Sequence, residues 1–122
     1  MISCGVGEDV SFEQALSTIG VSGLLYDGYV DKLPENIDGF SFIKKYIGSG
    51  VGMATLSSVI AEVKATQSFN HLILKSDIEG SEWEVLAEDI DFNVFSQIVI
   101  ELHWITDIAF DSVGQYFQLS KN

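Results

Sequence analysis

Short runs of apolar residues alternate along this chain with longer stretches in which apolar residues return every three or four positions. The short runs are typical of strands, and the longer stretches are typical of amphipathic helices. Strands are therefore predicted over residues 1–4, 21–26, 40–47, 71–76 and 97–102. Helices are predicted over residues 10–19, 55–66, 81–87 and, near the end of the chain, 106–119.

The first helix should turn an apolar stripe toward the core, with Ser11 as its N-terminal cap. The stripe consists of Val10, Phe12, Ala15, Leu16 and Ile19. The helix over 55–66 carries a similar stripe, made of Leu56, Val59, Ile60 and Val63. Each helix should therefore cover a sheet with one face.

Two of the predicted strands are apolar without interruption, at residues 72–74 and 98–100. Strands of this kind are buried on both faces, as in parallel sheets covered by helices on each side. The chain of 122 residues is long enough for one such domain. In open parallel sheets, ligands bind at the carboxyl ends of the strands, near the point where strand order reverses. Candidate chemistry is therefore sought directly after each strand.

Charge narrows the classes of partner. The formal net charge is −12, with six Lys and no Arg. A nucleic-acid interface needs basic side chains to neutralise phosphates, and an anionic membrane surface would repel this chain. No apolar run is long enough to span a membrane, and no signal-peptide pattern is present. Cys4 is the single cysteine, which fits a reducing, cytoplasmic setting.

The segment after the first strand reads Ser3-Cys4-Gly5-Val6-Gly7-Glu8-Asp9. Gly5 and Gly7 would let the backbone turn sharply and approach a ligand closely. Asp27 follows the second strand, where an acidic side chain can accept hydrogen bonds from ribose hydroxyls. The alternative interpretations are an ordinary strand-to-helix turn for the glycines and a turn-forming role for Asp27 before Gly28.

Three carboxylates, those of Asp77, Glu79 and Glu82, follow the strand over 71–76. One interpretation is structural: Asp77 caps the next helix, and the two glutamates favour its N-terminal dipole. The functional interpretation is that Asp77 and Glu79 point into a ligand crevice.

Glu101 and His103 follow the last predicted strand and share a face if the backbone is extended. A histidine beside carboxylates is a candidate proton acceptor, so His103 is the first choice for this role and Asp77 the second. A structural role for His103 is the alternative. The same side chains, with Glu79, could instead gather a divalent cation, although the sequence leads us to assign no metal.

The segment from Leu72 to Glu82 (LILKSDIEGSE) resembles the signature of the FkbM-type methyltransferases. Residues 97–104 (QIVIELHW) resemble the strand that follows it in that family, and residues 3–13 resemble a variant glycine loop. The resemblance implies a Rossmann-like class I methyltransferase fold with S-adenosylmethionine as the methyl donor. It also implies O-methylation of a small molecule or a glycan.

Carried over residue by residue, the resemblance gives Gly5 and Gly7 to the methionine part of the cofactor and Asp27 to its ribose. Asp77 and Glu79 would stand beside cofactor and acceptor. Many methyltransferases have an acidic residue in place of Ser3 and a glycine in place of Asp9.

The family fold normally has further strands, so we expect this chain to be a truncated domain. The alternative function is a non-catalytic domain that binds the cofactor or a protein, and self-association stays open. A phospho-acceptor receiver domain ranks lower, because it needs acidic residues where Ser3, Cys4 and Gly48 stand.

Overall fold

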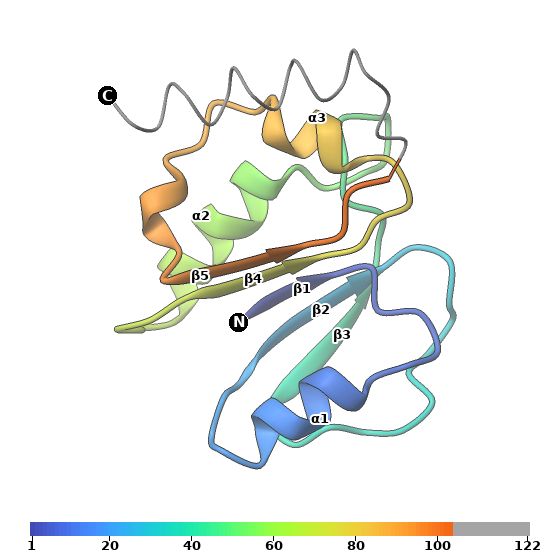
Figure 1. Cartoon of the computed structure of the whole chain (residues 1–122), viewed down its shortest axis with the longest axis vertical. Coiled ribbons are helices and arrows are strands. Elements are labelled where there is room, and N and C mark those ends of the chain that lie inside the picture. Colours follow the sequence, from blue (N-terminus) through green and yellow to red (C-terminus); the bar gives the residue numbers. More distant parts are fainter. Residues whose placement is uncertain (104–122) are drawn as a thin grey trace.

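The computed structural model describes residues 1–103 and shows a parallel sheet with helices on both faces (Figure 1). The strands, in the order β3-β2-β1-β4-β5, are β1 Ile2–Cys4, β2 Gly23–Asp27, β3 Phe40–Lys44, β4 Ile73–Ser76 and β5 Gln97–Ile100. The helices are α1 Ser11–Ser17, α2 Leu56–Thr66 and α3 Glu82–Leu86, with a 3-10 turn at Phe92–Val94. The predicted α/β fold with a parallel, Rossmann-like sheet is confirmed. The helix predicted over 106–119 lies outside the described residues.

The order of the strands defines where a ligand would bind. The chain runs from β1 outward through β2 to β3, and then crosses back to place β4 on the other side of β1. Strand order therefore reverses between β1 and β4. Because all neighbouring strands pair in parallel, their carboxyl ends lie at one edge of the sheet. Ligands of such sheets bind at that edge, beside the reversal.

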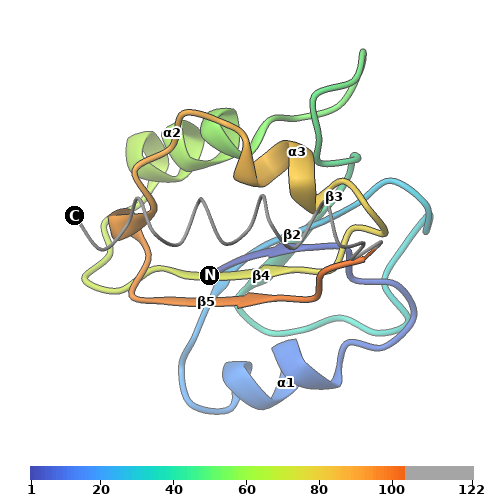
Figure 2. The ribbon, with the colours of Figure 1, turned by 45° about the horizontal axis from the view of Figure 1, so that its top comes forward.

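Helix α1 covers one face of the sheet, and α2 and α3 cover the other (Figure 2). On β1, Ile2 and Cys4 point into the core under α2 and α3, because side chains alternate along a strand. Cys4 is a core residue with 1% of its surface exposed, and this burial raises the pKa of its thiol to about 12. On the α1 side a smaller cluster forms from Val6, Val10, Leu25 and Ile37.

The prediction for α1 was wrong in its detail. Of the expected apolar stripe Val10 is buried, but Ile19 is 75% exposed and Phe12 is 40% exposed, so most of the stripe does not face the core. The fully buried side chain of this helix is Glu13, which accepts hydrogen bonds from Ser3 Oγ at 2.7 Å and Lys75 Nζ at 2.9 Å. These polar partners on β1 and β4 stabilise a charged residue at the buried position. Ser11 is the first helical residue rather than the cap.

Strand β5 also departs from the prediction. It begins and ends within the predicted range, but Ile98 and Val99 are 42% and 49% exposed. An apolar run therefore did not imply burial on both faces here, in β5, which is the outer strand of the described sheet. β3 is shorter than predicted, and Ile47 instead pairs with Ala54 in an isolated bridge.

Three carboxylates on or just after α3 tie this short helix to its surroundings. Glu82 accepts hydrogen bonds from the turn that precedes the helix. Glu84 accepts two hydrogen bonds from Ser49, through its N–H and its hydroxyl. Glu88 accepts hydrogen bonds from the N–H groups of Leu56 and Ser57 at the start of α2. No helix within residues 1–103 is long and apolar enough to cross a membrane.

Candidate active site

The glycine loop lies directly against the end of β4. Gly5 follows β1 with a φ of 76°, in the left-handed region that favours glycine. A Cβ on Gly5 would come within 1.6 Å of the Asp77 carbonyl oxygen. Gly7 also has a positive φ, of 61°, but a Cβ there would meet nothing within 4 Å. Gly5 is therefore required by packing, whereas Gly7 lies beside open space.

Asp27, at the end of β2, holds the glycine loop in place. Its Oδ2 accepts hydrogen bonds from the N–H groups of Val6 and Gly7, at 3.0 and 2.8 Å. Its Oδ1 accepts hydrogen bonds from Tyr29 and Val30, at 2.7 and 3.1 Å. A carboxylate offers about four acceptor positions, so these bonds use all of them. Burial alone would raise the pKa of Asp27, but the four backbone hydrogen bonds outweigh it and lower that pKa.

A tight turn connects β4 to α3. Glu79 has a φ of 55°, and it is the one non-glycine residue with positive φ in the part of the chain that the structure describes. The turn is held by Glu82, whose Oε1 and Oε2 accept hydrogen bonds from Ile78 N and Gly80 N, both at 2.8 Å. The side chain of Glu82 is fully buried. Burial would raise the pKa of Glu82, but the hydrogen bonds from the turn and from His103 lower it.

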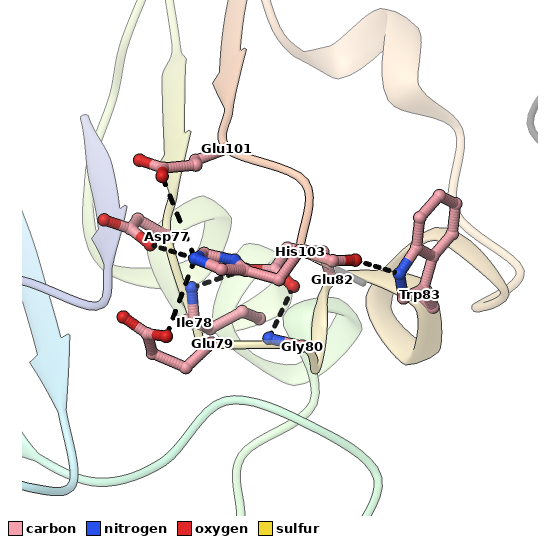
Figure 3. A network of polar contacts seen from close by, with 8 residues as sticks. All are labelled: Asp77, Ile78, Glu79, Gly80, Glu82, Trp83, Glu101 and His103. Carbon is pink, nitrogen blue, oxygen red and sulfur yellow. Dashed lines mark hydrogen bonds and ion pairs between the residues drawn. The ribbon is translucent and has the colours of Figure 1, made fainter. Parts of the chain in front are cut away.

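His103 follows β5 and is fixed at two points (Figure 3). Its Nδ1 lies 2.9 Å from Glu82 Oε1, and its carbonyl oxygen accepts a hydrogen bond from Trp83 Nε1 at 2.7 Å. The hydrogen bond to Glu82, helped by the charges of Glu82, Glu79 and Asp77, raises the pKa of His103. The ring is thus oriented by α3, and its other nitrogen, Nε2, is directed away from Glu82.

Three carboxylates surround this second nitrogen (Figure 3). Nε2 lies 3.5 Å from Glu79 Oε2, 3.6 Å from Asp77 Oδ1 and 3.8 Å from Glu101 Oε1. These separations exceed normal hydrogen-bond lengths. Asp77 Oδ1 is enclosed by protein and has no hydrogen-bond partner. The cluster carries more negative charge than one imidazole can balance, so it suits a ligand or ion of positive charge.

The structure brings the sequence-predicted residues together along one edge. Gly5 contacts Asp77, Gly7 contacts Asp27, and the Asp77 and Glu79 carboxylates face His103. One structural interpretation was wrong: Asp77 does not cap α3, whose first turn makes no side-chain cap. Glu101 and His103 do approach each other, although β5 ends at Ile100, before either residue.

Two residues that orient His103 were not predicted. Glu82 was predicted only to interact with the helix dipole, and no site role was predicted for Trp83. Three acidic residues lie within six positions here, so the sequence alone does not show which of them is buried. The signal that could have found Glu82 is the turn itself, because a four-residue turn with Gly80 leaves backbone N–H groups that need an acceptor.

A parallel α/β sheet with its polar side chains gathered beside the strand reversal is the arrangement of Rossmann-like domains, in which ligands bind at that edge. The family model described as "Methyltransferase FkbM domain" matches residues 1–121. The chain therefore belongs to the FkbM methyltransferase family. No curated protein and no solved structure matches it.

Proposed function

We propose that this protein transfers a methyl group from S-adenosylmethionine to a hydroxyl oxygen of a small molecule or glycan. The observation that carries the proposal is the meeting of the glycine loop with the Asp77–Glu79 turn and His103 at the strand reversal, in a chain of the FkbM methyltransferase family. Positioning of the two reactants can supply roughly 7–11 kcal/mol in well-aligned systems.

The residues at this edge fit the charge of the cofactor. Within residues 1–103, the cationic partner of Asp77, Glu79 and Glu101 is His103 alone. Their surplus negative charge favours a sulfonium or an ammonium group. Gly7 leaves open space beside the loop. When bound, the cofactor supplies a methyl group on a sulfonium sulfur.

Asp27 fits its predicted role less directly. All four acceptor positions of its carboxylate are used by backbone N–H groups. It can accept a ribose hydroxyl only if it shares or gives up one of these bonds, for example that from Val30, which is the longest at 3.1 Å. Its assignment to the ribose stays a prediction.

The acceptor hydroxyl loses one proton as it is methylated. Nε2 of His103 is the first candidate to take it, because Nδ1 is held by Glu82 and Nε2 faces the carboxylates. Oδ1 of Asp77, which has no hydrogen-bond partner, is the second. A positioned base contributes roughly 10²–10⁴-fold to the rate.

Calorimetry with S-adenosylhomocysteine tests the cofactor claim. We expect saturable binding to the folded chain in buffer containing EDTA. Asp77→Asn should weaken it about tenfold, which corresponds to the loss of one charge-assisted contact of roughly 1.4 kcal/mol. Glu35→Gln removes the same charge from an exposed loop and should change nothing. Absence of binding heat at millimolar ligand, with circular dichroism showing folded protein, would refute the proposal.

A further inference from the structure

The polar cluster at the end of β4 has the geometry of a cation site. One ligand atom each from Asp77, Glu101 and His103 lie within 4.8 Å of one another. The imidazole Nε2 stands 3.6 Å from Asp77 Oδ1 and 3.8 Å from Glu101 Oε1. Metal–ligand distances of about 2.1 Å in a tetrahedral site place the ligands roughly 3.4 Å apart. The two distances from Nε2 are therefore within a few tenths of an ångström of the spacing around one ion, and all three ligand atoms stay within 4.8 Å of one another.

Asp77 gives an independent reason to place a cation here. Its Oδ1 is enclosed and accepts no hydrogen bond, although it belongs to a carboxylate. An unpaired polar atom removed from water is costly, and a charged one more so. The imidazole nitrogen at 3.6 Å is too distant to compensate by a hydrogen bond. A positive ion between the two atoms would satisfy both.

His103 is also prepared as a ligand by its other contacts. Histidines that bind metals almost always donate their second ring N–H to a carboxylate or carbonyl, which fixes the ring and increases its basicity. Glu82, whose side chain is fully buried, provides this carboxylate at 2.9 Å from Nδ1. The bond from Trp83 Nε1 to the His103 carbonyl fixes the backbone of the ligand.

We propose that Asp77, Glu101 and His103 together bind one divalent first-row metal ion, such as Mn²⁺ or Zn²⁺. One nitrogen and two carboxylate oxygens suit these ions better than Ca²⁺ or Mg²⁺, which prefer oxygen ligands throughout. Three protein ligands leave coordination positions open to water or to a substrate oxygen. Glu79 lies outside the mutually close set.

The ion would assist the proposed methyl transfer, but the cation site itself does not depend on that function. A hydroxyl bound at an open coordination position becomes more acidic, because the metal stabilises its alkoxide. The ion would then take over the activation of the acceptor from Nε2 of His103 and Oδ1 of Asp77. Only this use of the ion rests on the proposed methyl transfer.

Electron paramagnetic resonance with Mn²⁺ tests the site on the metal-free full chain. Free Mn²⁺ gives a signal that bound Mn²⁺ loses, so a titration yields the number of sites and their affinity. We expect one site per chain that is tighter than the background binding of an acidic protein. Glu101→Gln should weaken that site at least about tenfold, as loss of metal-site partners does elsewhere.

Two variants make the result decisive. The Glu101 side chain is 67% exposed, so Glu101→Gln should leave the fold intact. Glu35→Gln removes the same charge at a distant exposed position and should retain the tight site. Titrations that are indistinguishable among the wild type, Glu101→Gln and Glu35→Gln would overturn the proposal.

The cation site and the methyltransferase proposal can fail separately. Binding of S-adenosylhomocysteine in EDTA without a tight Mn²⁺ site overturns the cation site and leaves methyl transfer standing. A tight Mn²⁺ site that Glu101→Gln weakens, without any cofactor binding heat, supports the cation site and overturns the proposed function.

Discussion

At the scale of single residues, Glu82 explains how the site is held. Its buried carboxylate accepts hydrogen bonds from two backbone N–H groups of the turn and contacts the imidazole of His103. A buried charge is stable only when such partners satisfy it. The same residue therefore shapes the Asp77–Gly80 turn and directs Nε2 of His103 toward the carboxylates.

Replacing this carboxylate should cost stability. Glu82→Leu would leave the N–H groups of Ile78 and Gly80 and the His103 ring without their acceptor, at about 3 kcal/mol in total. Urea denaturation followed by circular dichroism measures the loss. Glu84→Gln, on the same helix but exposed, should cost less than about 1 kcal/mol. Equal losses in the two variants would show that burial of Glu82 is not what stabilises the turn.

At the scale of elements, the glycine loop takes its shape from its neighbours. The end of β2 supplies the Asp27 carboxylate that accepts its N–H groups, and the end of β4 supplies the backbone against which Gly5 packs. The loop sequence alone could not predict this, because the two contacts come from residues 20 or more positions away.

The two glycines should therefore respond differently to alanine. Gly5→Ala adds a Cβ that collides with the Asp77 carbonyl and also strains a positive φ. Gly7→Ala adds only the conformational strain, about 1–2 kcal/mol, because the space around it is open. Thermal denaturation should show Gly5→Ala to be less stable than Gly7→Ala by at least about 1 kcal/mol. The reverse order would contradict the packing of the loop on β4.

The hydrogen bonds by which the Asp27 carboxylate connects β2 to the glycine loop should contribute less stability in acid. The folded-state pKa of Asp27 is lowered from its ordinary 3.8, so its contribution to stability is complete above that value. The contribution is lost as the pH falls through the lower, folded-state pKa. Asp27→Asn should be less stable at pH 7 by about 2 kcal/mol, because an amide cannot accept all four hydrogen bonds.

The measurement is urea denaturation of both proteins between pH 7 and pH 3. The stability difference between the wild type and Asp27→Asn should stay constant down to about pH 4 and shrink below it. A difference that does not change over this range would mean that the Asp27 pKa is not lowered by folding. Other carboxylates titrate in both proteins, so their effect cancels in the comparison.

At the scale of the whole molecule, the sequence predicted the order in which strands and helices follow one another along the chain. It also predicted the edge of the sheet at which polar residues gather. Strand-forming runs and glycine turns are local signals, and they place Asp27 at the end of its strand and Asp77 and Glu101 directly after theirs. Burial is not a local property, which is why the α1 stripe and the burial of β5 were predicted wrongly. Glu13 on α1 is buried although it is charged, because Ser3 of β1 and Lys75 of β4 donate hydrogen bonds to its carboxylate.

The carboxylates of α3 and the residue just beyond it fasten this one short helix to three separate segments: the turn before it, Ser49, and the first residues of α2. Any displacement of α3 would have to break all three attachments at once. If this edge of the sheet adjusts to a substrate, we expect the movement in the glycine loop near Gly7, where an added Cβ would meet no atom within 4 Å, rather than in α3.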